Sequence, residues 1–123
     1  MKSDEIDLHK ELKKYFGFNQ FKGLQEQVVK NIISGNNTFV IMPTGGGKSL
    51  CYQIPSLLLD GTTIVISPLI SLMKDQVNAL TQVGIPAAYL NSSLSERQFD
   101  AALKRLAEGK YRIVYVAPER LLT

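Results

Sequence analysis

The first third of the chain carries apolar residues at helical spacing. Repeats of three and four positions predict one helix beginning after Ser3 and a second running from Lys22 to Ser34. Acidic residues precede basic ones in the first helix, an order that suits the helix dipole. Gly35 follows the second helix as a C-terminal cap. The residues expected to face the interior are Leu8, Leu12, Tyr15, Phe16, Val28, Val29, Ile32 and Ile33.

Beyond Gly35, short apolar runs alternate with helical patterns. The runs predict strands at 38–42, 63–67, 87–90 and 112–117. A helix that carries Cys51 to Leu59 follows the first run, a second helix ends near Gly84, and a third closes at Gly109. Apolar strands that alternate with helices are typical of a parallel sheet covered on both faces. The pattern therefore predicts a three-layer α/β fold.

Two of these helices have clear start signals. Ser67 followed by Pro68 predicts an N-cap and a proline in the first helical position. Ser95 and Gln98 form a capping box in which Leu94 can pack onto Phe99. The apolar stripes expected along the two helices are Leu69, Leu72, Met73, Val77 and Leu80 in the first, and Leu103 and Leu106 in the second.

Composition limits the class of protein. The 123 residues, 45% apolar and 20% charged, suit one compact soluble domain. No apolar run approaches the ~20 residues of a membrane span, and the charged N-terminus lacks a signal-peptide core, so we expect a cytoplasmic protein, nucleoid-associated if bacterial. The net charge of +3 permits nucleic-acid contact without arguing for it. Cys51 is expected to be a small buried residue, and one cysteine with an isolated His9 argues against a His/Cys metal site.

The stretch from Pro43 to Ser49 has the composition of a phosphate-binding loop. It would lie between a strand and a helix, where three glycines allow backbone N–H groups to surround an anion. Lys48 could reach the β- and γ-phosphates of a nucleotide, and the Ser49 hydroxyl could hold Mg²⁺. Met42 stands where the strict pattern has glycine, which counts against kinases and GTPases of that pattern. The alternative is a glycine turn with a solvated Lys48.

Four segments together resemble the motifs of RecQ-type DNA helicases, members of helicase superfamily 2. "MPTGGGKSLCYQIP" resembles motif I, "FGFNQFKGLQ" motif 0, "VISPLISLMKDQV" motif Ia and "YVAPERLL" motif Ib. The resemblance covers nearly the whole chain, with the motifs in the family's order. A DEAD-box RNA helicase would usually carry Ala-x-Thr-Gly-Ser-Gly-Lys-Thr at the loop, which this chain lacks.

The resemblance implies an ATP site. Gln25 would read the adenine edge, with Phe18 and Lys22 on either side of the ring, and Lys48 would be the catalytic lysine. The family usually has arginine at the Lys22 position, and lysine lacks the planar group that stacks on a base, so adenine would be held less tightly. Without the resemblance, a plain backbone hydrogen bond explains Gln25 equally well. The implied phosphate contacts are Thr44, Gly45, Gly46, Gly47, Lys48 and Ser49, with Mg²⁺ on Ser49.

The resemblance also implies contacts to the DNA backbone. These fall at Ser67, Pro68 and Leu69, at Asn91 and Ser92, and at Arg120. From the residues alone, ordinary helix capping explains Ser67 as well as a phosphate contact does. Glu119 and Arg120 fit structural ion pairing as readily as DNA binding.

The family's Asp-Glu-x-His motif does not occur in the sequence, in which the only Asp-Glu pair is Asp4–Glu5. We therefore expect a truncated RecA-like P-loop domain, the front part of the first motor domain, with a motif 0 helical region at 1–35 and a P-loop sheet region at 36–123. The intact protein would be an ATP-dependent DNA helicase that unwinds DNA 3′–5′ in repair and recombination, with a second RecA-like domain as partner. The piece alone would bind ATP without unwinding and would self-associate through its exposed sheet edge. The alternatives are a DEAD-box-like RNA helicase piece or a stand-alone ATP- or nucleic-acid-binding module.

Overall fold

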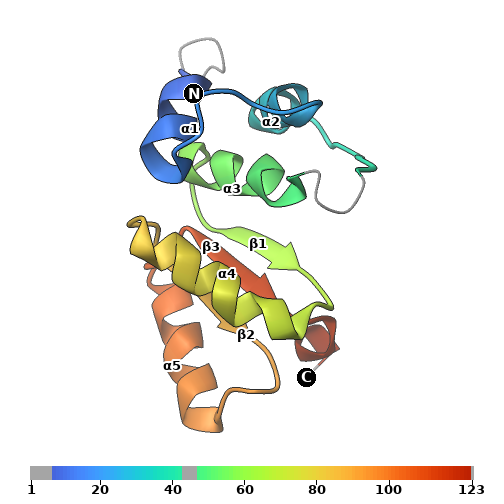
Figure 1. Cartoon of the computed structure of the whole chain (residues 1–123). Helices are drawn as coiled ribbons and strands as arrows, with labels where there is room; N and C mark the ends of the chain where they lie inside the picture. The colour runs from blue at the N-terminus through green and yellow to red at the C-terminus, as the bar shows by residue number, and fades with distance from the viewer. Residues whose placement is uncertain (1–6, 43–46, 123) are drawn as a thin grey trace. The chain divides into compact units, whose positions relative to one another are not determined.

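The computed structural model describes residues 7–42 and 47–122 of the chain. The chain divides into two compact units, Met1–Asp60 and Gly61–Thr123. Each unit has its own helices (Figure 1). Each also has its own hydrophobic core. We describe them one after the other.

The first unit consists of three helices, α1 (Leu8–Phe16), α2 (Gln25–Ile33) and α3 (Lys48–Leu58). The start predicted after Ser3 is wrong for α1: Asp7 is the N-cap, and its carboxylate accepts a hydrogen bond from the Lys10 N–H at 3.2 Å. Ser3 itself lies outside the described residues. The stripes predicted for α1 and α2 meet α3 in one core, whose buried members are Leu8, Leu12, Val29, Ile33 and Ile54.

The strand predicted at 38–42 is not formed. This segment has no regular secondary structure, and the three-stranded sheet of the described residues does not include it. The alternation of a strand remains visible in its exposure: Phe39 and Ile41 are 90% and 82% exposed, whereas Val40 and Met42 are half-buried. An apolar run becomes a strand only when a neighbouring strand pairs with its backbone, and the sequence of the run does not show whether such a neighbour is present.

Helix α3 contains a proline in its interior. Pro55 has no N–H to donate to the carbonyl of Cys51, one turn earlier. Both Pro55 and the neighbouring Ser56 are fully buried, and the Ser56 hydroxyl donates to the Gln53 carbonyl at 2.6 Å. Cys51 is buried as predicted, and burial raises the pKa of its thiol.

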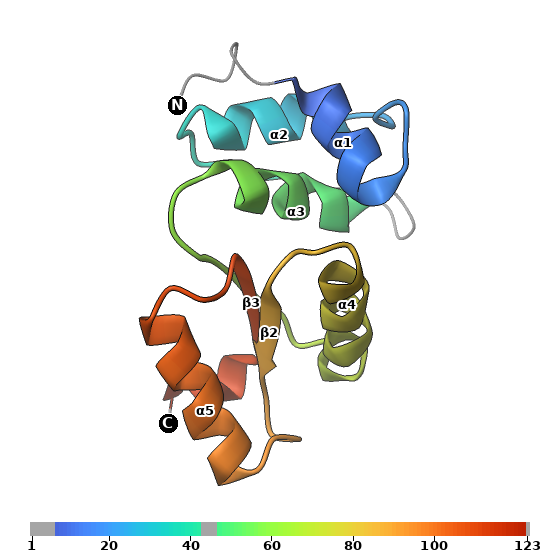
Figure 2. The same ribbon diagram turned by 90° about the vertical axis from the view of Figure 1, so that its left-hand side faces the viewer.

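The second unit is a small α/β sandwich. Its elements are β1 (Thr63–Ile66), α4 (Ile70–Gln82), β2 (Ala87–Leu90), α5 (Glu96–Ala107), β3 (Ile113–Val116) and the short helix η2 (Pro118–Leu122). The strands are parallel in the order β1-β3-β2. Figure 2 shows α4 and α5 on opposite faces of this sheet. The predicted three-layer parallel arrangement is thus confirmed for this unit.

The central strand β3 is buried along its whole length, as predicted for a strand covered on both faces. On the α5 face, the buried members of the core are Leu90, Ala102, Val114 and Val116. The edge strand β1 is less well covered: Ile64 and Ile66 are about half exposed. Their partners in the register are Val114 and Val116, so both isoleucines lie on the α5 side of the sheet.

The two predicted helix starts have different outcomes. Ser67 is not the N-cap of α4, because Leu69 occupies that position with non-helical dihedral angles. The Ser67 hydroxyl instead accepts the Leu69 N–H at 3.1 Å in a local turn. Leu69 and Leu72 are exposed, contrary to the predicted stripe, whereas Met73, Val77 and Leu80 are buried as predicted.

The α5 start is confirmed. Ser95 and Gln98 form the complete capping box, and Leu94 and Phe99 pack on the same core. Leu106 packs there too, whereas Leu103 is exposed.

Candidate functional site

A cavity of about 230 Å³ lies in the first unit, between the segment that precedes α2 and the start of α3. It brings together residues that are 22 or more positions apart in sequence, such as Gln25 and Gly47. Its lining residues are Phe18, Gln20, Lys22, Gln25, Gly47, Ser49 and Leu50. Five of the seven are predicted nucleotide-site residues. Gln20 and Leu50 are the two that sequence reasoning missed.

The segment before α2 presents alternate side chains to this cavity. Phe18, Gln20 and Lys22 line it, whereas Phe21 packs against the core of the first unit. Phe21 also meets the ring of His9 edge-on, with centroids 5.3 Å apart. Because Phe21 is held inward, its neighbours are held on the cavity side. Gln20 lies midway between Phe18 and Lys22, the two residues predicted to enclose the base. This alternation of every second residue is the signal that could have revealed Gln20.

Gln25 connects the two walls of the cavity. It is only 2% exposed, and its Nε2 donates to the Gly47 carbonyl at 3.0 Å. Its Oε1 accepts the Lys22 N–H at 2.7 Å. The plain backbone hydrogen bond considered for this residue is therefore present, twice. A neutral carboxamide has two donors and two acceptor sites, so one N–H and one lone pair of Gln25 remain.

Gly47 is the N-cap of α3 and has a left-handed conformation, with φ of 78°. A Cβ atom at this position would clash with Nε2 of Gln25. The glycine is therefore required twice, once by its backbone angle and once by the side chain that lies against it. Gly47 supplies no side-chain cap to α3, and the first N–H groups of a helix have no partner within the helix itself.

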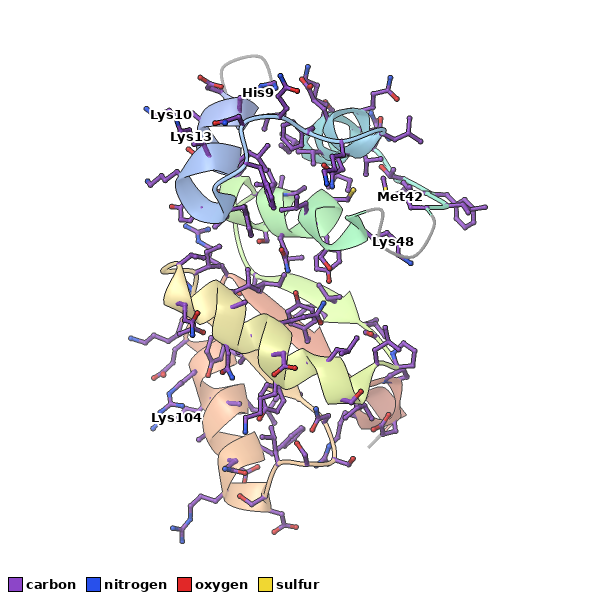
Figure 3. All side chains as sticks on the ribbon, viewed as in Figure 1. His9, Lys10, Lys13, Met42, Lys48 and Lys104 are labelled. Carbon is purple, nitrogen blue, oxygen red and sulfur yellow. The ribbon has the colours of Figure 1, made fainter. Side chains whose placement is uncertain are left out.

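The remaining loop residues are distributed differently. Thr44, Gly45 and Gly46 lie outside the described residues, so their predicted phosphate contacts stay predictions. Lys48 is the first residue of α3 and is exposed. Its side chain lines a second cavity, together with Met42, Cys51 and Tyr52 (Figure 3). In this conformation the structure does not bring Lys48 into the cavity that holds Gln25.

The surface near α2 carries a charged pair. Lys30 Nζ lies 2.9 Å from Glu26 Oε2, and this hydrogen bond lowers the pKa of the Glu26 carboxyl. His9 Nε2 is 3.8 Å from the other oxygen of Glu26. Among the described residues, no group of three His, Cys, Asp or Glu side chains is placed to hold a metal.

In the second unit, the predicted DNA contacts all follow the carboxyl ends of parallel strands. Ser67 to Leu69 come after β1, Asn91 and Ser92 after β2, and Arg120 after β3. The Ser67 N–H donates to Val116 O at 3.1 Å and the Ala117 N–H to Leu90 O at 3.0 Å, which ties the three strand ends together. Ligands of open α/β sheets gather at such an edge.

These residues differ in what they can present to a ligand. Pro68, Leu69 and Ser92 are exposed. Asn91 is buried: its Oδ1 accepts the N–H and the hydroxyl of Ser93, at 2.8 and 2.6 Å, and its Nδ2 contacts Met73 Sδ on α4 at 3.5 Å. Asn91 thus shapes the loop in which Ser92 lies.

The Arg120 side chain lies against α5. Its guanidinium carbon is 4.3 Å from the centre of the Phe99 ring, a cation–π contact. Phe99 in turn packs on the core of the second unit. Arg120 therefore has a structural role, and its contact with DNA stays a prediction.

A model of the DEAD/DEAH box helicase family matches residues 22–123. This chain belongs to that family. It is 55% identical over 108 residues to the ATP-dependent DNA helicase RecQ of Bacillus subtilis and 49% identical over 112 residues to that of Haemophilus influenzae. It is also 41% identical over 130 aligned residues to the RecQ-like DNA helicase blm-1 of Caenorhabditis elegans. These alignments cover 87%, 91% and 97% of this chain but 18%, 18% and 13% of the relatives.

The resemblance to RecQ-type helicases is thereby confirmed. The DEAD/DEAH box match begins at Lys22, so it includes Gln25, the start of α3 and the whole second unit. Phe18 and Gln20, on the remaining wall of the cavity, precede it. Within residues 7–42 and 47–122, no helix of this helicase-family chain has the length and apolarity of a membrane span.

Proposed function

We propose that this chain carries the ATP-binding part of a DNA helicase. The observation that carries the proposal is the cavity in which Phe18, Lys22 and Gln25 meet the N-terminus of α3. The helix end offers to phosphate a partial positive charge and N–H groups that have no partner within the helix. At the other wall, the Phe18 ring offers a stacking surface to a base, Lys22 offers a positive charge, and the Gln25 carboxamide offers hydrogen bonds.

The two backbone bonds of Gln25 support selection of adenine. A free carboxamide can turn over and exchange its donor and acceptor, so it can form a single hydrogen bond with position 6 of either purine. Here the Lys22 N–H holds Oε1 and the Gly47 carbonyl holds Nε2. The remaining N–H and lone pair of Gln25 are therefore offered in a fixed order. Adenine presents a donor at N6 beside the acceptor N7, whereas guanine presents two acceptors, O6 and N7. One donor and one acceptor on Gln25 therefore match adenine and not guanine.

The chemistry of phosphate binding falls to Lys48 and Ser49. Lys48 would contact the β- and γ-phosphates after its flexible side chain turns towards the bound nucleotide, and the Ser49 hydroxyl would hold Mg²⁺. A hydrogen bond to a charged group contributes about 1.5–3 kcal/mol. We therefore expect Lys48→Ala to weaken Mg·ATP binding by about 10- to 100-fold.

Titration calorimetry with Mg·ATP tests this proposal. Lys13→Ala is the matched control, since Lys13 is an exposed lysine of the same unit on α1 (Figure 3). The proposal predicts weaker binding for Lys48→Ala and unchanged binding for Lys13→Ala. Equal affinities for wild type and Lys48→Ala would contradict it. Gln25→Ala should in addition lower the preference for ATP over GTP.

The strand ends of the second unit are proposed to contact the DNA backbone. Pro68, Leu69 and Ser92 are exposed there, on loops that three parallel strands bring to one edge. Backbone contacts position a protein without reading sequence. The names of the RecQ relatives support DNA as the nucleic acid. Unwinding 3′–5′ in repair and recombination, with a second RecA-like domain, is proposed for the whole protein.

A further inference from the structure

Gln20 has a free carboxamide on the wall of the nucleotide cavity. It is exposed, it lines the cavity with Phe18 and Lys22, and its side chain makes no hydrogen bond among the described residues. Gln25, the other carboxamide of this cavity, is buried and bound to two backbone groups. The cavity therefore contains one fixed and one free carboxamide.

The position of Gln20 is determined by its neighbours. Phe21 packs against the core of the first unit, and this directs Gln20 and Lys22 to the cavity side of the segment. The first turn of α3, with Gly47 and Ser49, forms the opposite wall, where phosphate would bind. Gln20 thus lies on the wall that would face the base, two residues after Phe18 and two before Lys22.

We propose that the Gln20 carboxamide hydrogen-bonds the purine base of the bound nucleotide. This inference rests on the proposed ATP site and extends it to a residue that precedes the part of the chain matched by the family. Since no described residue fixes the Gln20 amide, it can rotate to pair with donors or acceptors. Gln20 therefore adds affinity for purine nucleotides in general, whereas discrimination between adenine and guanine belongs to Gln25.

The test compares three ligands on the whole chain in the presence of Mg²⁺: ATP, GTP and inorganic tripolyphosphate, which has no base. The variant is Gln20→Ala, and the matched control is Gln27→Ala, an exposed glutamine of α2 outside this cavity. Gln20→Ala should weaken ATP and GTP by the same factor, about three- to tenfold, which is the contribution of one neutral hydrogen bond. Tripolyphosphate binding should not change, and Gln27→Ala should match wild type for all three ligands.

The outcomes separate this inference from the proposal beneath it. Wild-type ATP affinity in Gln20→Ala would overturn the role of Gln20 and leave the ATP site intact. An equal loss for tripolyphosphate would also overturn it, since Gln20 would then act on the phosphate loop and not on a base. A change in the ATP-to-GTP ratio would assign discrimination to Gln20, contrary to the proposal. A wild-type chain that binds none of the three ligands would refute the ATP site and this role together.

Discussion

Replacing Gly47 with alanine should destabilise the first unit more than replacing any glycine at an open turn. Alanine in the left-handed conformation costs about 1–2 kcal/mol. At Gly47 the new methyl group would also clash with Gln25 Nε2, and the displaced carboxamide would lose its bonds to Gly47 O and Lys22 N. Two neutral hydrogen bonds add about 1–3 kcal/mol. We expect a total cost of about 2–5 kcal/mol.

Gly17→Ala provides the matched control for this experiment. Gly17 has φ of 76°, nearly the angle of Gly47, but nothing lies within 4 Å of the position that its new methyl group would take. It should therefore show the backbone cost alone. Urea denaturation followed by far-ultraviolet circular dichroism gives the free energy of unfolding of each variant. Equal losses for Gly17→Ala and Gly47→Ala would refute the reasoning.

A double-mutant cycle identifies Gln25 as the cause. In a Gln25→Ala background the methyl group at position 47 meets a shorter side chain, and the two hydrogen bonds are already absent. Gly47→Ala should then cost only about as much as Gly17→Ala, an interaction energy of about 1–3 kcal/mol between the two sites. Strict additivity of the two substitutions would show that the Gln25 side chain does not lie against Gly47 in solution.

Three further outcomes are expected. DNA binding should be weak, insensitive to sequence and steeply weakened by salt; a fluorescence titration that finds strong sequence preference at physiological salt would contradict backbone contacts. Phosphate release by this chain should stay near background with or without single-stranded DNA, because it contains no Asp-Glu-x-His motif, and DNA-stimulated hydrolysis that Lys48→Ala abolishes would overturn this. Lys30 lowers the pKa of Glu26, so this pair stabilises the fold above the ordinary pKa of 4.5, and the contribution is lost as pH falls through the lowered value. The stability of a Glu26→Gln variant should therefore approach that of wild type in acid. A difference in stability that is independent of pH would count against the pair.

Most of the second unit could be predicted from local patterns. Ser95 and Gln98 form their capping box whatever surrounds them, because both partners lie within one turn. The parallel sheet follows from apolar strands that alternate with helices. Ser67 misled the prediction because Ser-Pro fits a helix start and a local turn equally well, and the ψ angle of Leu69 decides between them.

The candidate nucleotide site was less accessible from sequence. The glycines and Lys48 indicate a phosphate loop, but the cavity depends on contacts between distant segments, such as Gln25 with Gly47. Gln20 resembles a solvated loop residue, and only its place midway between Phe18 and Lys22 hints at the cavity that the structure shows. At residues 38–42 the sequence predicted a strand that is not formed. Its alternation is typical of a strand, but pairing requires a partner strand that no local pattern specifies.

The proline within α3 has a mechanical consequence. Backbone hydrogen bonds between successive turns make a helix resist bending, and the bond from the residue 55 nitrogen to the Cys51 carbonyl is absent because Pro55 has no N–H. The turns from Lys48 to Ile54 therefore lack one backbone restraint, and they are held instead by side-chain packing, with Ile54 in the core and Leu50 against it. The far end is anchored in a rigid interior by Pro55 and Ser56. A ligand bound to the N–H groups at the start of α3 would thus act on a segment whose position depends on the packing of the first unit.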